Sequence, residues 1–141
     1  MSVRTGAWRA GALIAASLGG ASLLISLLGL RRAARIVWWC ADRFPAGSLA
    51  IPPEQLAERQ ARFIAVVAER LPFRPLCLPR ALVLAGLLRR RGLDGELCLG
   101  ARVLGEFEAH AWIEMQGRPI HEPADLNTTY RCLWRLPTVT S

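Results

Sequence analysis

The apolar residues of this chain change their spacing at Gly92. Before it, apolar side chains recur every three or four positions, as on one face of a helix, at Leu78, Ala81, Leu82, Ala85 and Leu88. An earlier helix, opened by Pro53, is predicted over 53–70. After Gly92, apolar residues alternate with other residues over 97–104 and 107–115, which is typical of half-buried strands. Helices followed by consecutive strands predict an α+β fold, with helices packed on a small antiparallel sheet.

Two prolines fix where the helix before Gly92 begins. Pro75 and Pro79 bracket Cys77, and proline is tolerated in the first turn of a helix but not in its interior. The helix is therefore predicted to start at about residues 76–78, with Cys77 at its N-terminus. There the unpaired backbone N–H groups and the helix dipole favour a thiolate and can hold an oxyanion. A buried, unreactive cysteine is the alternative.

The first fifty residues are predicted to form a helical region, 1–50, ahead of a domain over 51–141. Turn-forming residues over 44–53 favour a connection between the two. Residues 10–30 carry no charge for 21 positions, which is long enough to cross a bilayer. Three interpretations stay open for this stretch: a helix packed on the domain, a membrane helix that lies in or spans the bilayer, or a helix that docks a partner.

Charge and cysteine content restrict the partners. The 141 residues are 52% hydrophobic, enough for one sizeable core, and all 18 basic residues are arginine, giving a net charge of +7. The arginines are scattered and accompany no nucleic-acid-binding motif, so no nucleic acid is expected as a partner. The four cysteines have irregular spacings, and Cys40 and Cys98 lie in apolar surroundings that predict core packing. We therefore expect a protein of the reducing cytoplasm with no metal or cofactor.

His110 lies in the second predicted strand. By alternation, it shares one face of that strand with Glu108, Trp112 and Glu114. A Cys-His pair that performs acyl transfer also needs an acceptor that orients the histidine and stabilises its cation. The nearby candidates for this acceptor are Glu108, His121, Glu122 and Asp125.

The length of the next turn decides which candidate faces His110. With a two-residue loop that ends at Gly117, Glu122 lies opposite Ala111, on the wrong face of the strand. With a three-residue loop that ends at Gly117 in the left-handed conformation, Glu122 lies directly opposite His110. We prefer the three-residue loop and Glu122, with His121 as the acceptor if the loop is shorter or a bulge intervenes.

Together these residues resemble the lasso-peptide leader peptidase family, whose members have a transglutaminase-like cysteine peptidase domain. The similarity covers about residues 50–125 and rests on the ordered segments 76–82 (LCLPRAL), 87–93 (LLRRRGL), Gly100, 109–114 (AHAWIE) and 117–120 (GRPI). It implies an α+β fold with a transglutaminase-like, papain-like core. In such a core the nucleophile lies at a helix N-terminus packed on a small antiparallel sheet, here preceded by N-terminal helices.

The resemblance implies a cysteine endopeptidase, a hydrolase in which Cys77 is the nucleophile and His110 the base. The third member in the family is an aspartate. This chain has Glu122 at the matching place, which keeps the charge but adds a methylene. Backbone N–H groups at Cys77 and Leu78 are expected to hold the oxyanion. The candidate substrate contacts are Trp112 and Arg80.

By the same resemblance, the substrate is a ribosomally made precursor peptide. It is cut between leader and core before a separate ATP-dependent lasso cyclase closes the macrolactam. Residues 1–50 are too apolar to form a leader-recognition domain, so a separate recognition protein is expected as a partner. The alternatives are a catalytically weak peptide-binding module on the same scaffold, an accessory protein associated with the membrane through residues 10–30, and an acyl transferase that uses an amine in place of water.

Overall fold

Two helices form the N-terminal part of the chain. The computed structural model describes residues 2–47 and 49–139, and the chain begins with α1 (Ser2–Leu28) and α2 (Leu30–Arg43). Gly29 separates the two helices with a φ of 81°, in the left-handed region that glycine adopts without strain. The uncharged stretch is therefore helical, and the chain turns at its end.

The next two helices have the predicted limits. α3 (Pro53–Arg70) has proline in its first turn, and α4 (Cys77–Arg90) starts at Cys77. Gly92, with a φ of 67°, ends the turn after α4. The predicted connection between α2 and α3 is irregular over 44–47 and 49–52, and Ser48 lies outside the described residues.

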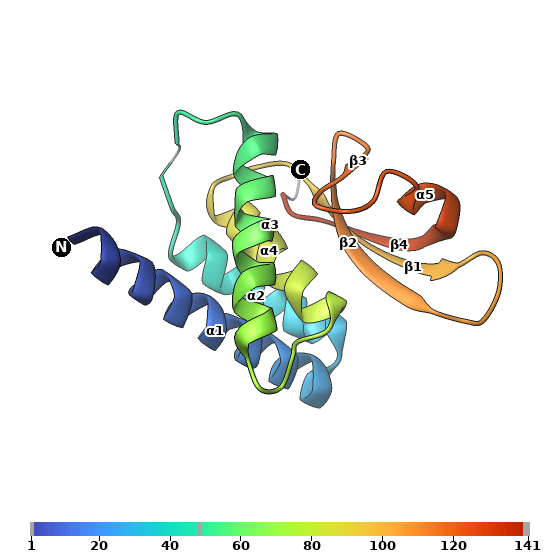
Figure 1. The fold of residues 1–141 in the computed structure, drawn as a ribbon, viewed down its shortest axis with the longest axis horizontal. Coiled ribbons are helices and arrows are strands. Elements are labelled where there is room, and N and C mark those ends of the chain that lie inside the picture. Colours follow the sequence, from blue (N-terminus) through green and yellow to red (C-terminus); the bar gives the residue numbers. More distant parts are fainter. Residues whose placement is uncertain (1, 48, 140–141) are drawn as a thin grey trace.

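An antiparallel sheet follows the helices, as predicted, and it has one strand that the sequence did not predict. Its four strands have the order β3-β2-β1-β4, and each pairs antiparallel with its neighbours. The strands are β1 (Glu96–Arg102), β2 (Ala109–Met115), β3 (Arg118–Pro119) and β4 (Tyr130–Pro137), with the short helix α5 (Leu126–Thr129) before β4. Figure 1 shows the sheet on one side of the molecule and the long helices on the other.

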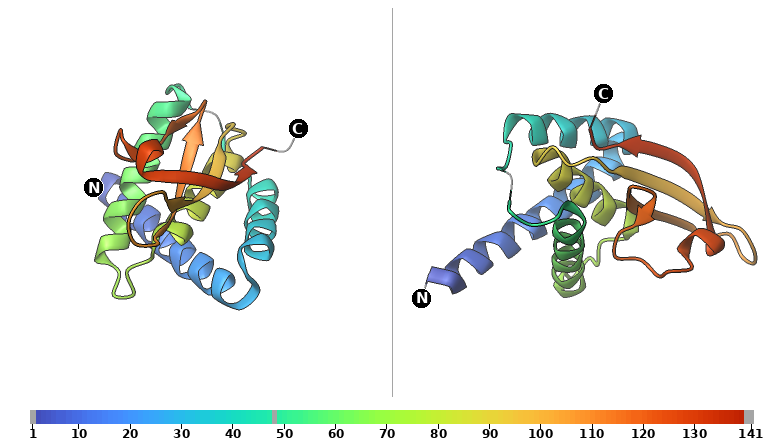
Figure 2. Two further views of the ribbon diagram at one scale, coloured as in Figure 1. Left: turned by 90° about the vertical axis from the view of Figure 1, so that its right-hand side faces the viewer. Right: turned by 90° about the horizontal axis from the view of Figure 1, so that it is seen from above.

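The long helices and one face of the sheet share a single core. Ile14 and Leu18 of α1 belong to the same buried cluster as residues of α3 and α4, so the core extends across residue 50. From the sheet, Ala111 and Ile113 of β2 join this cluster. The opposite face of the sheet carries a smaller cluster, formed by Cys98, Trp112 and Leu126. The two further views in Figure 2 show the helices gathered against one side of the sheet.

The two cysteines that the sequence assigned to the core differ. Cys98 is fully buried, which confirms the prediction for that residue. The prediction for Cys40 is wrong, because Cys40 is exposed. It lies on the outer side of α2, while Trp38 and Ala41 occupy the side that packs against the core.

Gly100 in β1 is a position where the fold requires glycine. A Cβ atom there would lie 2.6 Å from the Arg131 carbonyl oxygen and 2.6 Å from the Trp112 ring. We expect Gly100→Ala to lower the free energy of unfolding by about 1–3 kcal/mol through overpacking, measured by chemical denaturation. The matched control is Gly20→Ala in α1, where a Cβ would meet nothing within 4 Å. Helix propensity should make this control neutral or stabilising by up to about 1 kcal/mol; an equal loss in both variants would contradict the packing argument.

Candidate active site

Cys77 occupies the first position of α4, with Leu76 as the N-cap residue. The first turn presents the N–H groups of Cys77 and Leu78 ahead of the helical ladder. Pro79 has no N–H, and the N–H of Arg80 bonds to the Leu76 carbonyl at 3.4 Å. The thiol is half-buried at this position. Both prolines therefore place the thiol where the sequence predicted it, at the N-terminus of a helix.

The thiol of Cys77 lies beside His110, which is the second residue of β2. A hydrogen bond with His110 lowers the pKa of the Cys77 thiol below its ordinary value of 9.0. Burial opposes this change, and backbone hydrogen bonds with Ala111 and Leu78 reinforce it. The same thiol and Glu122 raise the pKa of His110 to about 9. These shifts favour a thiolate paired with an imidazolium.

Glu122 holds the far side of the imidazole. His110 Nε2 lies 3.1 Å from Glu122 Oε1, and the two side chains are 22% and 18% exposed, so solvent has little access to the contact. Because Nε2 is used in this way, Nδ1 is the nitrogen left for the Cys77 sulfur. The structure thus brings the three predicted site residues together.

The register predicted for the hairpin is nevertheless wrong. β2 and β3 are joined by a two-residue loop, with φ of 52° at Gln116 and 76° at Gly117, and Met115 pairs with Arg118. Continued pairing would place Glu122 on the wrong face of the sheet. β3 ends first, and His121 has a φ of 55° that turns the next residue toward His110.

His121, the alternative acceptor, contacts a different carboxylate. Its backbone N–H donates to Glu58 Oε1 at 2.8 Å, and its Nδ1 lies 3.7 Å from Glu58 Oε2. The side chain that accepts from His110 is Glu122, so the alternative assignment of His121 is wrong. Sequence reasoning missed Glu58 because it lies on α3, 63 positions from His121.

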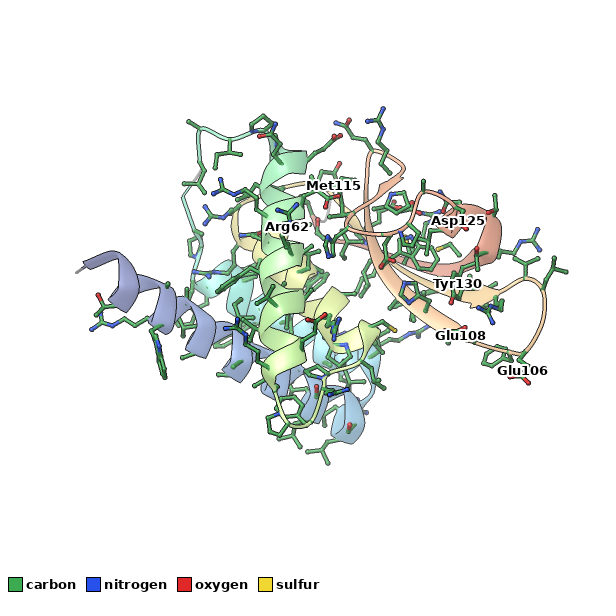
Figure 3. All side chains as sticks on the ribbon, viewed as in Figure 1. Arg62, Glu106, Glu108, Met115, Asp125 and Tyr130 are labelled. Carbon is green, nitrogen blue, oxygen red and sulfur yellow. The ribbon has the colours of Figure 1, made fainter. Side chains whose placement is uncertain are left out.

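Two aromatic rings support the imidazole from the sheet. The His110 ring centroid lies 5.8 Å from that of Trp112, in a stacked arrangement, and 5.1 Å from that of Tyr130 on β4. Figure 3 shows Tyr130 near Glu108, at the end of the sheet where β2 begins. Tyr130 was not a sequence candidate, since β4 was not predicted and no local pattern links it to His110.

A charged network fixes the indole of Trp112. Its Nε1 donates to Glu114 Oε1 at 3.0 Å, and Arg135 Nη1 donates to Glu114 Oε2 at 2.7 Å. Burial opposes ionisation of Glu114, but the bonds from Arg135 and Trp112 outweigh it and hold its pKa below the usual range. Arg135 also donates to Glu96 and to the sulfur of Cys98, at 2.8 and 3.3 Å. These three acceptors lie close enough together for a metal site, but the Arg135 guanidinium contacts all of them.

The three site residues open into a cleft of about 570 Å³. Its floor is mainly apolar and comes from α3, α4 and β2; the lining includes Ala61, Ile64, Ala65, Ala81, Leu84, Ile113 and Ile120. Charged side chains of Glu69, Arg74 and Arg80 border it. Trp112 also borders the cleft but is only 2% exposed, so its visible role is packing beneath His110.

Comparison with known proteins adds one finding. A family model described as the transglutaminase-like superfamily matches residues 23–135, which include every residue of the site. This superfamily includes cysteine peptidases. Neither a curated protein nor a solved structure matches the chain.

The ion pair predicts how the reactivity of Cys77 changes with pH. Because its thiol pKa is lowered, Cys77 should react with iodoacetamide with a midpoint clearly below pH 9.0, and the imidazolium should persist up to about pH 9. His110→Ala removes the largest cause of the shift and should move the midpoint up toward 9.0. The rate of alkylation is measured from the mass of the peptide that contains Cys77. All variants carry Cys40→Ser, since Cys40 is also an exposed thiol. An unchanged pH profile in His110→Ala would contradict the pair.

Proposed function

The chain belongs to the transglutaminase-like superfamily, and we propose that within it the protein is a cysteine endopeptidase that removes the leader from a ribosomally made lasso-peptide precursor. One observation carries the proposal of catalysis: Cys77, His110 and Glu122 line one cleft, and Glu122 Oε1 lies 3.1 Å from His110 Nε2, which leaves the other ring nitrogen for the thiol. This is the arrangement of nucleophile, base and orienting acid that acyl transfer requires.

The proposed reaction begins with the thiolate of Cys77, which attacks the scissile carbonyl carbon. The carbonyl oxygen becomes an oxyanion, and the N–H groups of Cys77 and Leu78 at the start of α4 are the proposed donors to it. His110 gives its proton to the departing amine, and the C–N bond breaks to leave a thioester on Cys77. Water, deprotonated by His110, then hydrolyses the thioester and regenerates the thiolate.

Glu122 acts on His110 in two ways in this reaction. Its carboxylate fixes the ring so that Nδ1 faces the sulfur, and its negative charge stabilises the imidazolium that donates the proton. Trp112 and Tyr130 limit the tilt of the ring from the other side. His110 therefore has one orientation in which it serves both the nucleophile and the leaving group.

The cleft supports a peptide as substrate. Its lining is mainly apolar with charged side chains at its border, so it suits a peptide with an apolar side chain near the cleaved bond. The choice of a lasso precursor rests on the resemblance of residues 76–82, 87–93 and 109–114 to the leader peptidase family. A separate leader-recognition protein and a lasso cyclase in the cytoplasm are the partners that this function needs. Arg80, which borders the cleft, is the proposed substrate contact.

The test is cleavage of a candidate precursor in the presence of a recognition partner, followed by mass spectrometry. Wild-type protein should release leader and core, each with the mass of a hydrolysed product. Cys77→Ala should give no product, and His110→Ala should be slower by about 10²-fold or more. Cys40→Ser, which removes an exposed thiol on α2, should cleave at the wild-type rate. Cleavage by Cys77→Ala at the wild-type rate would contradict the proposal. A product that carries an added amine would show that the protein is an acyl transferase instead.

The charge of Glu122 gives a separate prediction. Glu122→Gln keeps the size of the side chain but cannot stabilise the imidazolium, so kcat/KM should fall by about 10²–10⁴-fold. Glu122→Asp keeps the charge and should lose less. The control is Glu106→Gln, at the far end of the loop between β1 and β2 (Figure 3), which should leave kcat/KM unchanged. A Glu122→Gln enzyme within twofold of wild type would show that the carboxylate has no role.

A further inference from the structure

The α1 helix is long and apolar enough to cross a membrane, yet little of it is buried. Over Thr5–Leu28 its mean hydropathy is 2.0, and 17% of its apolar window is buried. Its inner side, with Ile14 and Leu18, packs into the core. Its outer side exposes Leu13 and Leu27, at 68% and 72%. A helix that is apolar on all sides is normally covered on all sides, so the outer side of α1 requires an apolar cover.

The exposed surface continues from α1 onto α2. A mainly apolar cavity of about 410 Å³ lies between α1, α2 and α4, and its lining includes Leu24 of α1, Ile36 of α2 and Leu87 of α4. On α2, Trp39 is 65% exposed, and Trp8 near the start of α1 is 80% exposed. Figures 1 and 2 show the first half of α1 projecting away from the rest of the protein. We call this exposed surface of the two helices the α1–α2 face.

The charges of this region have one sign. The first 41 residues contain no aspartate or glutamate, and their arginines are Arg4, Arg9, Arg31, Arg32 and Arg35. The next residue, Asp42, is held by two hydrogen bonds from Arg89, each of 2.8 Å. Arginine beside exposed tryptophan and leucine matches an anionic lipid surface, since tryptophan prefers the boundary between headgroups and acyl chains.

We propose that the α1–α2 face binds the surface of an anionic lipid bilayer. The outer leucines of α1 lie among the upper acyl chains, Trp8 and Trp39 lie at the headgroup boundary, and the arginines of α2 contact phosphates. α1 does not cross the bilayer, because crossing would pull Leu18, which is fully buried, out of the core shared with α3 and α4.

This arrangement leaves the candidate active site free. Among the described residues, those that line the cleft come from α3, α4, the connection between these two helices and the segment from β2 to Glu122, and none lies on α1 or α2. The family match also begins only at residue 23, so most of the projecting part of α1 precedes it. The proposal therefore adds a place of action to the protein and does not depend on the proposed peptidase activity.

The experiment is flotation of the full chain with vesicles of phosphatidylglycerol and, separately, of phosphatidylcholine. We expect binding to the anionic vesicles that weakens with salt, and little binding to the neutral ones. Arg31→Gln with Arg32→Gln should weaken binding by about 30-fold, from the known electrostatic contribution of each basic residue. Trp8→Glu with Leu13→Glu should abolish it.

Matched control variants distinguish binding through the α1–α2 face from nonspecific binding through any exposed charge or apolar side chain. Arg59→Gln with Arg62→Gln removes the same charge from exposed positions on α3 (Figure 3), and should weaken binding by less than threefold. Leu104→Glu with Phe107→Glu replaces residues that are 83% and 84% exposed, in the loop between β1 and β2, and should bind as wild type. Far-ultraviolet circular dichroism confirms that each variant is folded.

Three outcomes would overturn the proposal. The first is no binding to phosphatidylglycerol vesicles, and the second is equal loss of binding in test and control variants. The third is binding to both lipids that resists alkaline carbonate, which would identify α1 as a spanning helix.

Discussion

The candidate site depends on the contact between the start of α4 and the open edge of β2. β3 pairs with Glu114 and Met115, and within the described residues no strand lies beside the edge of β2 nearer its start. α4 takes that place, and backbone hydrogen bonds of Ala111 and Leu78 both reach the Cys77 sulfur. The dipole of α4 and backbone groups from both α4 and β2 therefore act on the Cys77 sulfur. A longer β3 would close the edge and remove this environment.

The same sheet shows what happens to a thiol without such an environment. Cys98 of β1 is fully buried, and burial together with the nearby Glu114 carboxylate raises the pKa of its thiol far above the usual range. Cys77 is also partly buried, but hydrogen-bond donors and a histidine surround it and lower its pKa. Around Cys98, burial and the Glu114 charge outweigh the Arg135 guanidinium, whereas around Cys77 the hydrogen bond with His110 and the backbone donors outweigh burial.

The sequence predicts the parts of the site that local rules control. Pro75 and Pro79 define the start of α4, and alternation places His110 on its strand. The hairpin register could not be predicted in the same way, because Gln116 adopts a left-handed conformation that hairpin turns normally give to asparagine, aspartate or glycine. β4 was not predicted, for another reason. Arg135 on this strand pairs with Glu96 and Glu114, which lie 39 and 21 positions away along the chain and come close to it only in the folded sheet.

The replacement of aspartate by Glu122 is consistent with the path of the chain before it. His121 leaves the strand ladder with a positive φ, and Glu58 of α3 accepts its backbone N–H at 2.8 Å. This contact fixes the Cα position of Glu122 beyond the end of β3, and from there the glutamate reaches His110 Nε2 at 3.1 Å. An aspartate at the same Cα would end about 1.5 Å earlier, one carbon–carbon bond short, which would weaken its hydrogen bond to His110 while keeping its charge. The longer side chain of Glu122 thus makes up for the displacement of its Cα by the kink at His121. The kink and the glutamate together bring the carboxylate within hydrogen-bond distance of His110.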